Sequence, residues 1–199
     1  MRCTVRSLVE EARVLLDLNP VGYACGDTLT VDRILTGRLQ QAVRETLAEA
    51  PLQLLGAGTP LRESIVWHRR HEKWWGSILL PDDFVRMLVF EMTGWSRTAR
   101  FIQPDSPLYP FQHSPYSGVG GCPERPVAVV VPSAFGPQLE FFSCRCCREQ
   151  VAQARYLPLP QPDTDGAIDL PPALTDQVAR RMAALAAQVL AQSYEQKFP

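Results

Sequence analysis

Long apolar runs are missing from this sequence. It contains no stretch of about 18 apolar residues, the minimum for a membrane-spanning helix, so we expect no membrane span. The first residues, 1–6, are not followed by the apolar stretch of a secretory signal peptide. These two absences predict a protein made and used inside a cell, where its six cysteines would be reduced thiols.

An excess of charge is missing as well. The chain of 199 residues has 20 Lys and Arg against 21 Asp and Glu, which leaves a net charge of −1. This composition indicates no general attraction to nucleic acid or to an acidic membrane. With 46% hydrophobic and 21% charged residues, the chain is typical of a folded domain with or without an insertion.

No catalytic or cofactor motif is present. The sequence has neither a Gly-x-Ser-x-Gly turn nor a His-Glu-x-x-His helix. Gly118, Gly120 and Gly121 do not form a phosphate-binding loop, because no Lys-Ser/Thr pair follows them. Asp82 and Asp83 are adjacent and would diverge by about 100° on a helix, which does not suit a paired acid/base site. We therefore expect no catalytic residues, no enzymatic activity and no cofactor.

The densest group of reactive side chains is Cys144, Cys146 and Cys147. A structural zinc site takes paired ligands about two to four residues apart, from two places in the chain. Here one residue and then none separates the cysteines, and Cys122 stands alone. We interpret these cysteines as small residues at a strand end and turn, and we expect no metal ligands among them.

What the sequence does contain is helical periodicity at both ends. Thr4 or Ser7 is a suitable cap for a first helix that ends at Asn19-Pro20, and a second helix is expected from Thr28 or Thr30 to about Ala50. After Pro171-Pro172, an apolar stripe predicts a long closing helix. The stripe consists of Leu174, Val178, Met182, Leu185 and Val189.

The middle of the chain has short apolar runs separated by many of the 18 prolines. This pattern is typical of strands, turns and extended connections. Strands are predicted at 63–67, 76–80, 126–131, 138–143 and 151–157, with a short extended piece at Ile168. Pro81 is expected to open a short helix, capped by Asp82 and Asp83, that gives way to a strand near Leu88. Residues 94–116 are expected to be irregular.

These patterns predict an α+β fold. Two N-terminal helices and one long C-terminal helix would form a helical bundle, and a mostly antiparallel β domain would be inserted between them. The predicted helical docking domain comprises residues 1–51 and 171–199. The predicted β domain, with long Pro-rich loops, comprises residues 52–170.

Contacts with a partner are predicted on the β domain. Four tryptophans, Trp67, Trp74, Trp75 and Trp95, should mostly belong to its core, but neighbours on a strand face opposite sides, so Trp74 or Trp75 should be partly exposed. An exposed Trp beside the charged hairpin loop 68–73 would suit a pocket on a protein partner. The loop 105–121 is a further candidate, as is the C-terminal tail 193–199 outside the β domain. The contact residues we predict are His68, Arg69, Arg70, His71, Lys73, Trp74, Tyr109 and Tyr116.

Several segments are similar to phage and prophage proteins. They are residues 78–87 (ILLPDDFVRM), Trp95, residues 105–109 (DSPLY), residues 121–127 (GCPERPV) and residues 139–144 (LEFFSC). With the order helix, helix, β insertion and closing helix, the chain resembles the head–tail connector proteins of tailed bacteriophages, also called adaptor, gateway or neck ring proteins. The similarity covers most of the chain from about residue 76 to residue 195.

The resemblance implies a structural virion protein of the phage neck, assembled in the host cytoplasm. About a dozen copies would form a homo-oligomeric ring that binds the portal protein on one side and tail or neck proteins on the other. Double-stranded DNA would pass through the lumen without sequence recognition. Two alternatives are another phage assembly factor, such as a tail-completion protein, and a small metal- or nucleic-acid-binding module. That module would use Cys144, Cys146 and Cys147 with His68 and His71.

Overall fold

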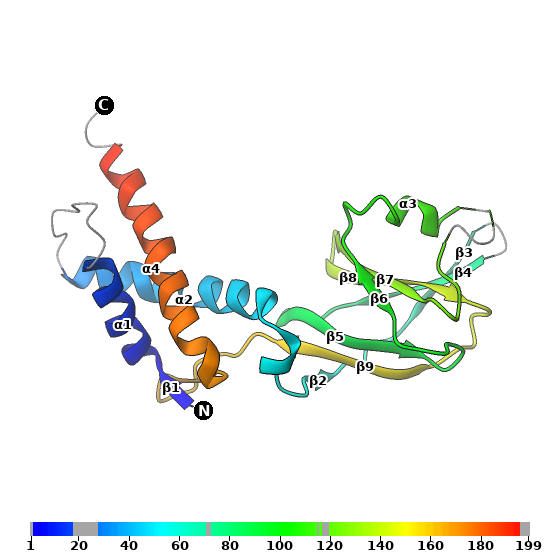
Figure 1. Ribbon diagram of the computed structural model, residues 1–199, viewed down its shortest axis with the longest axis horizontal. Helices are drawn as coiled ribbons and strands as arrows, with labels where there is room; N and C mark the ends of the chain where they lie inside the picture. Colours follow the sequence, from blue (N-terminus) through cyan, green and yellow to red (C-terminus); the bar gives the residue numbers. More distant parts are fainter. Residues whose placement is uncertain (1, 18–27, 71–72, 115, 117–119, 196–199) are drawn as a thin grey trace. The chain divides into compact units, whose positions relative to one another are not determined.

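A computed structural model of the protein describes residues 2–17, 28–70, 73–114, 116 and 120–195. Its fold is α+β, as the sequence predicted (Figure 1). Two N-terminal helices pack against a long C-terminal helix, and mostly antiparallel strands lie between them in the sequence. Among the residues described, no helix has both the length and the apolar character needed to span a membrane.

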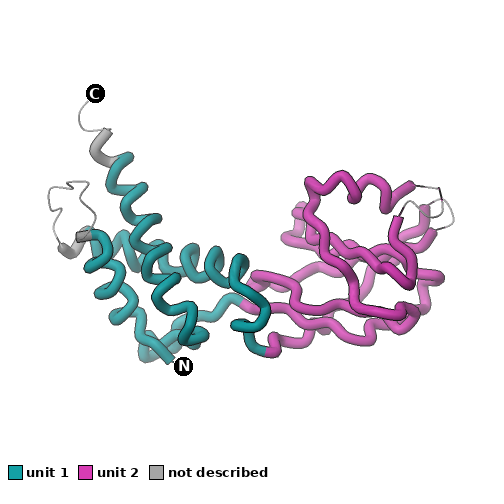
Figure 2. Tube along the Cα trace, viewed as in Figure 1, with its two compact units in different colours: residues 1–56, 159–199 teal, residues 57–158 magenta. Residues whose placement is uncertain are grey.

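The chain divides into two compact units, which Figure 2 shows in different colours. The helical unit comprises residues 1–56 and 159–199, and the β unit comprises residues 57–158. The helical unit contains β1 (Arg2–Thr4), α1 (Val5–Asp17), α2 (Thr28–Glu49), the short 3-10 helix η1 (Leu52–Leu54), β10 (Ala167–Asp169) and α4 (Pro172–Glu195).

The three long helices bury the apolar stripes that the sequence analysis identified. Leu174, Val178 and Met182 on α4 are fully buried, as are Leu8 on α1 and Leu35 on α2. The predicted cap of the first helix is confirmed, because the Ser7 N–H donates to Thr4 Oγ1 at 3.1 Å. The predicted Asn19-Pro20 helix end and the loop after it lie outside the described residues.

The compact units divide after residues 56 and 158, whereas the sequence pattern placed the divisions after residues 51 and 170. The pairing of β1 with β10 accounts for the second difference. In this antiparallel ladder Cys3 lies opposite Ile168, which is fully buried. The ladder therefore joins residues 159–170 to the helical unit through partners far apart in the sequence.

The β unit contains two sheets. The three-stranded sheet has the order β2–β9–β5 and the five-stranded sheet has the order β3–β4–β8–β7–β6; β6 and β7 are parallel, and all other pairs are antiparallel. The strands and the one helix are β2 (Thr59–Pro60), β3 (Val66–Arg70), β4 (Lys73–Leu79), β5 (Phe84–Met92), β6 (Arg100–Ile102), α3 (Tyr109–Gln112), β7 (Val127–Ser133), β8 (Gly136–Cys144) and β9 (Val151–Pro158).

The core of the β unit lies between the two sheets. Ile78 and Phe141 on the five-stranded sheet belong to the same buried cluster as Phe90 on β5. The rings of Phe90 and Phe141 are 4.9 Å apart, and Trp95 packs edge-on against Phe141 at 6.3 Å. Gly76 provides the space for the Phe141 ring, because a side chain there would collide with it.

The short helix predicted to begin at Pro81 is wrong. The Phe84 N–H donates to Pro81 O at 2.9 Å in a tight turn, and β5 begins at Phe84 itself. Asp83 does not cap a helix, since its carboxylate accepts a hydrogen bond from the Tyr156 hydroxyl at 3.2 Å. Pairing with β9 along the length of β5 overrides the local helix signal.

Two other expectations need correction. The charged segment 68–73 is largely strand, because β3 continues to Arg70 and β4 starts at Lys73. The segment 94–116 is not wholly irregular, since it contains β6 and α3. The predicted hairpin near residues 126–143 is confirmed as β7 and β8, with Ser133 paired to Gly136.

Candidate functional site

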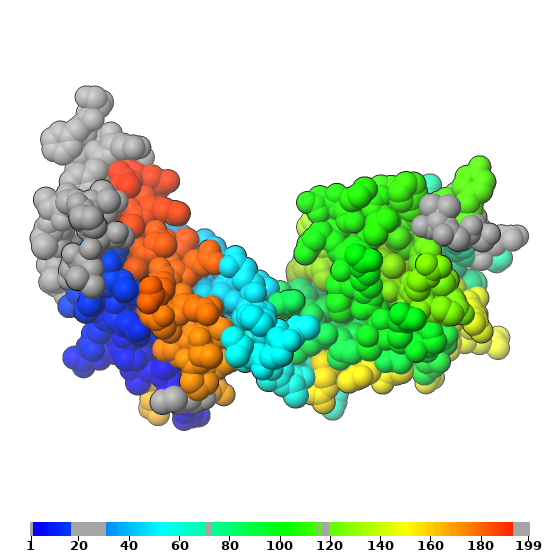
Figure 3. All heavy atoms as spheres, viewed as in Figure 1, coloured from blue at the N-terminus to red at the C-terminus, as the bar shows by residue number. Residues whose placement is uncertain are grey.

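One face of the five-stranded sheet points away from the core, and we call it the outer face. Cross-strand pairs place His68 beside Trp75 and Ser77 beside Glu140 on this face. The His68 and Trp75 rings stack at 4.0 Å. The helix α3 packs over the same face, where Tyr109 and His113 contact Phe142. In Figure 3 the green atoms of this part of the chain lie at the surface of the β unit.

Tyr109 and His113 attach α3 to the outer face. The Tyr109 hydroxyl donates to Glu140 Oε2 at 2.8 Å. Burial, together with this carboxylate, raises the pKa of Tyr109 to about 12. His113 packs edge-on against Phe142, with ring centres 5.0 Å apart.

His113 Nε2 lies 4.0 Å from Glu140 Oε2, within reach of an ion pair. Burial nevertheless lowers the pKa of His113, and this outweighs the opposite effect of Glu140. The imidazole is therefore neutral at pH 7. The pair is a contact between a carboxylate and a neutral ring at that pH.

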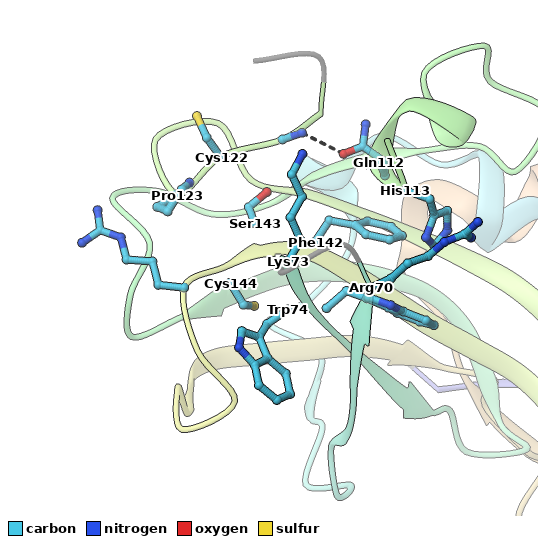
Figure 4. A pocket seen from close by; sticks show the side chains of 13 residues that line it. Arg70, Lys73, Trp74, Gln112, His113, Cys122, Pro123, Phe142, Ser143 and Cys144 are labelled. Carbon is cyan, nitrogen blue, oxygen red and sulfur yellow. Dashed lines mark hydrogen bonds between the residues drawn. The ribbon is translucent and has the colours of Figure 1, made fainter. Parts of the chain in front are cut away.

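A cavity of about 200 Å³ lies beside α3 (Figure 4). Lys73 lies at this cavity and donates from Nζ to the carbonyl oxygens of Ser114 and Tyr116, both at 2.9 Å. Gln112, which is 8% exposed, donates to Leu108 O and accepts from the Gly121 N–H at 2.8 Å. The Lys73 bonds hold the Pro-rich segment against its own sheet, and the Gln112 bonds join parts of that segment to each other.

A β-bulge shapes one wall of this cavity. Trp74 pairs with Cys144 and Gly76 with Phe141, so Phe142 and Ser143 together lie opposite Trp75. Ser143 has a φ of 83°, a strained conformation for a residue other than glycine. Its Oγ is buried without a hydrogen-bond partner among the described residues. The bulge thus leaves a polar group at the cavity wall.

The eight predicted contact residues differ in their surroundings. His68 bonds Ser77, while Lys73 and Tyr109 are held by the internal bonds described above. The side chains of Arg69, Arg70 and Tyr116 are exposed, Tyr116 by 74%. His71 lies outside the described residues. The half-buried Trp74 faces the core side of the strand, with the Arg69 guanidinium 5.5 Å from its ring centre.

His68 and Ser77 form a side-chain pair on the outer face that resembles a catalytic pair in its spacing. His68 Nε2 lies 3.0 Å from Ser77 Oγ, the separation of a nucleophile and its base. Ser77, however, is only 2% exposed and lies within a central strand, so a substrate has no access to its hydroxyl. This bond satisfies a buried polar pair.

The three clustered cysteines, Cys144, Cys146 and Cys147, differ in burial. Cys144 is buried, and burial raises the pKa of its thiol, so it remains protonated and unreactive. Cys146 is exposed and Cys147 is half-buried. Among the residues that the structure describes, no three His, Cys, Asp or Glu side chains are placed to hold a metal ion.

Several residues at this site have no signal in the sequence. His113 and Glu140 act through contacts that form only when α3 packs on the sheet, Gln112 through bonds within the α3 segment, and Ser143 through a bulge. At this site the α3 segment packs on the outer face of the five-stranded sheet, and exposed basic and aromatic side chains lie around it. No model of a known protein family matches the chain, and no curated protein is found to be similar to it.

Proposed function

We propose that the protein is a structural component of a tailed phage virion, a head–tail connector that joins the portal to the tail. The observation that carries this proposal is the organisation of the chain. The helix α4 packs against both α1 and α2, so the two ends of the chain form one helical unit. The β unit is inserted between them, and each unit therefore has its own surface for a partner.

Arginine–carboxylate pairs join the three long helices of the helical unit. Arg13 bonds Asp32 through two nitrogen–oxygen pairs at 3.1 and 2.7 Å, which joins α1 to α2. Arg181 joins α4 to Glu45 and Glu49 of α2. Bidentate arginine–carboxylate pairs fix geometry as well as adding stability. Three helices joined by ion pairs would keep their relative positions and present the same surface to each portal subunit.

Apolar and small side chains remain at the surface of this unit. Val14 on α1 is 58% exposed and Leu52 is 50% exposed. Ala184 is exposed on α4, whereas Ala183 and Ala186 are buried in the helical core. Small exposed residues allow the close approach of a neighbouring helix, which a ring of identical subunits would need.

The β unit offers different contacts. Phe135 is 87% exposed at the turn between β7 and β8. Ser133 holds this turn, since its Oγ donates to Gly136 O at 2.7 Å and accepts from the Phe135 N–H at 3.3 Å. An exposed aromatic side chain on a turn whose backbone is held in this way suits a pocket on a tail or neck protein. The burial of Ser77 and Cys144 also favours a role without covalent chemistry.

Fractionation of virions tests this proposal. DNA-filled heads without tails, and free tails, would be separated and the protein counted in each by quantitative mass spectrometry. A connector remains on filled heads at about a dozen copies per vertex. Recovery only with free tails would indicate a tail-completion protein instead, and absence from both fractions and from intact virions would overturn the proposal.

A further inference from the structure

A second cavity in the β unit is lined by three arginines that do not line the first cavity. Its volume is about 350 Å³, and Arg97, Arg100 and Arg125 contribute to its wall. All three side chains are exposed. The cavity shares Gln112 and Gly121, which are joined by a hydrogen bond, with the first cavity, so the two cavities adjoin at these residues.

The fold brings the arginines together from two parts of the chain. Parallel pairing of β6 with β7 places Arg100 opposite Val127, and the Arg100 N–H donates to Pro126 O at 2.9 Å. Ser96 donates to Pro123 O through both its N–H, at 3.0 Å, and its Oγ, at 3.2 Å. Because parallel strands begin at the same end of a sheet, these contacts gather the residues that precede both strands.

The electrostatics of the cavity favour an anion. Guanidinium groups stay charged at any physiological pH, so the three arginines bring three positive charges to the cavity wall. The carboxylate of Glu124, which is not part of the lining, interacts with Arg125 and offsets part of this charge. No Asp or Glu side chain is among the described residues that line it. None of the three arginines forms an ion pair within the described part of the chain. An occupant with several negative oxygens would relieve their mutual repulsion.

We propose that this arginine cavity binds a phosphate group. A carboxylate has two oxygens and is satisfied by one bidentate arginine, whereas a phosphate has enough oxygens for several guanidinium groups. The strand β6 is the edge strand of its sheet, and the arginines at its start are exposed, so a long polyanion has access to them. The phosphate would belong either to a nucleic acid backbone or to a free phosphate compound. This proposal does not rest on the proposed function.

Binding to purified full-length protein tests the proposal. Fluorescence anisotropy would measure a short duplex DNA of arbitrary sequence over a series of salt concentrations, and calorimetry would measure inorganic phosphate. The test variant combines Arg97→Gln, Arg100→Gln and Arg125→Gln. The matched control combines Arg33→Gln, Arg62→Gln and Arg148→Gln, three exposed arginines that line neither cavity. Thermal unfolding would verify that both variants are folded.

The test variant should bind at least about tenfold more weakly than wild type, and the magnitude of the slope of log K against log salt for DNA should fall by about 1, because the three arginines share one phosphate. The control should stay close to wild type. Loss of DNA binding would assign the cavity to a nucleic acid backbone, and loss of phosphate binding without any DNA binding would assign it to a free compound. Equal weakening in both variants, no binding by wild type, or tighter binding of polyglutamate than of either probe would overturn the proposal.

Discussion

The Tyr109 hydroxyl donates to Glu140 Oε2 at 2.8 Å, which joins α3 to the outer face of the five-stranded sheet. The two residues are 31 positions apart, and the segment between them is rich in proline. The helix α3 of this segment therefore lies on the sheet of its own unit. The partner contact predicted for the loop 105–121 remains a prediction.

Replacing Tyr109 with Phe should destabilise the β unit by about 1–3 kcal/mol, because the mostly buried Glu140 carboxylate loses its donor. Urea unfolding followed by tryptophan fluorescence measures this, since all four tryptophans lie within residues 57–158. Tyr116→Phe is the matched control and should change stability by less than about 0.5 kcal/mol, as its ring is 74% exposed. Equal effects of the two variants would contradict this account.

The same pair predicts a loss of stability at alkaline pH. The pKa of Tyr109 is about 12 in the folded chain and about 10 in the unfolded chain, so the folded state holds the proton more firmly. Its contribution is complete below about pH 10 and is lost as the pH rises toward 12. Unfolding free energies measured across this range should fall less steeply in Tyr109→Phe than in wild type. Identical slopes would show that Tyr109 titrates normally.

His113 predicts a second pH effect on the acid side. Burial lowers its pKa below the ordinary value of 6.5, so the unfolded chain binds the proton more readily. Stability is complete above about pH 6.5 and falls as the pH drops through the lowered pKa. NMR titration should show this imidazole changing below 6.5, with His113→Gln identifying its signal. A midpoint at or above 6.5 would mean that the Glu140 carboxylate outweighs burial.

Gly76→Ala should destabilise the β unit by about 1–3 kcal/mol. A methyl group there would collide with Phe141 Cζ and lie 2.7 Å from its Cε2, and Phe141 is fully buried.

Gly37→Ala provides the contrast, since nothing lies within 4 Å of that position on α2. It should stabilise the helical unit by about 0.5–1 kcal/mol. Denaturant unfolding measures both, and a neutral Gly76→Ala variant would contradict the packing described.

Local patterns predicted the parts of the fold that depend on neighbouring residues. The stripe of Leu174, Val178 and Met182 lies on one helix face, and the Thr4 cap is three residues from its donor. The β5 strand could not be predicted in the same way, because its pairing with β9 overrides a local helix signal at Pro81. The bulge at Ser143 likewise depends on a neighbouring strand.

The candidate sites were the least predictable part. His68 and Lys73 were expected in a solvated loop, but stacking and hydrogen bonds to distant residues hold them against the β unit. The gathering of Arg97, Arg100 and Arg125 requires the parallel pairing of β6 with β7, which nothing in the local sequence indicates. Sequence patterns identify reactive or charged side chains, but they do not predict which of these side chains come into contact in the folded chain.

The mass of the purified protein, alone and with the portal protein from the same genome, tests the connector proposal most directly. Native mass spectrometry or light scattering would determine how many copies associate. The proposal predicts a portal complex that carries about a dozen copies of this chain in a closed ring. A protein that stays monomeric and does not bind the portal ring would contradict it.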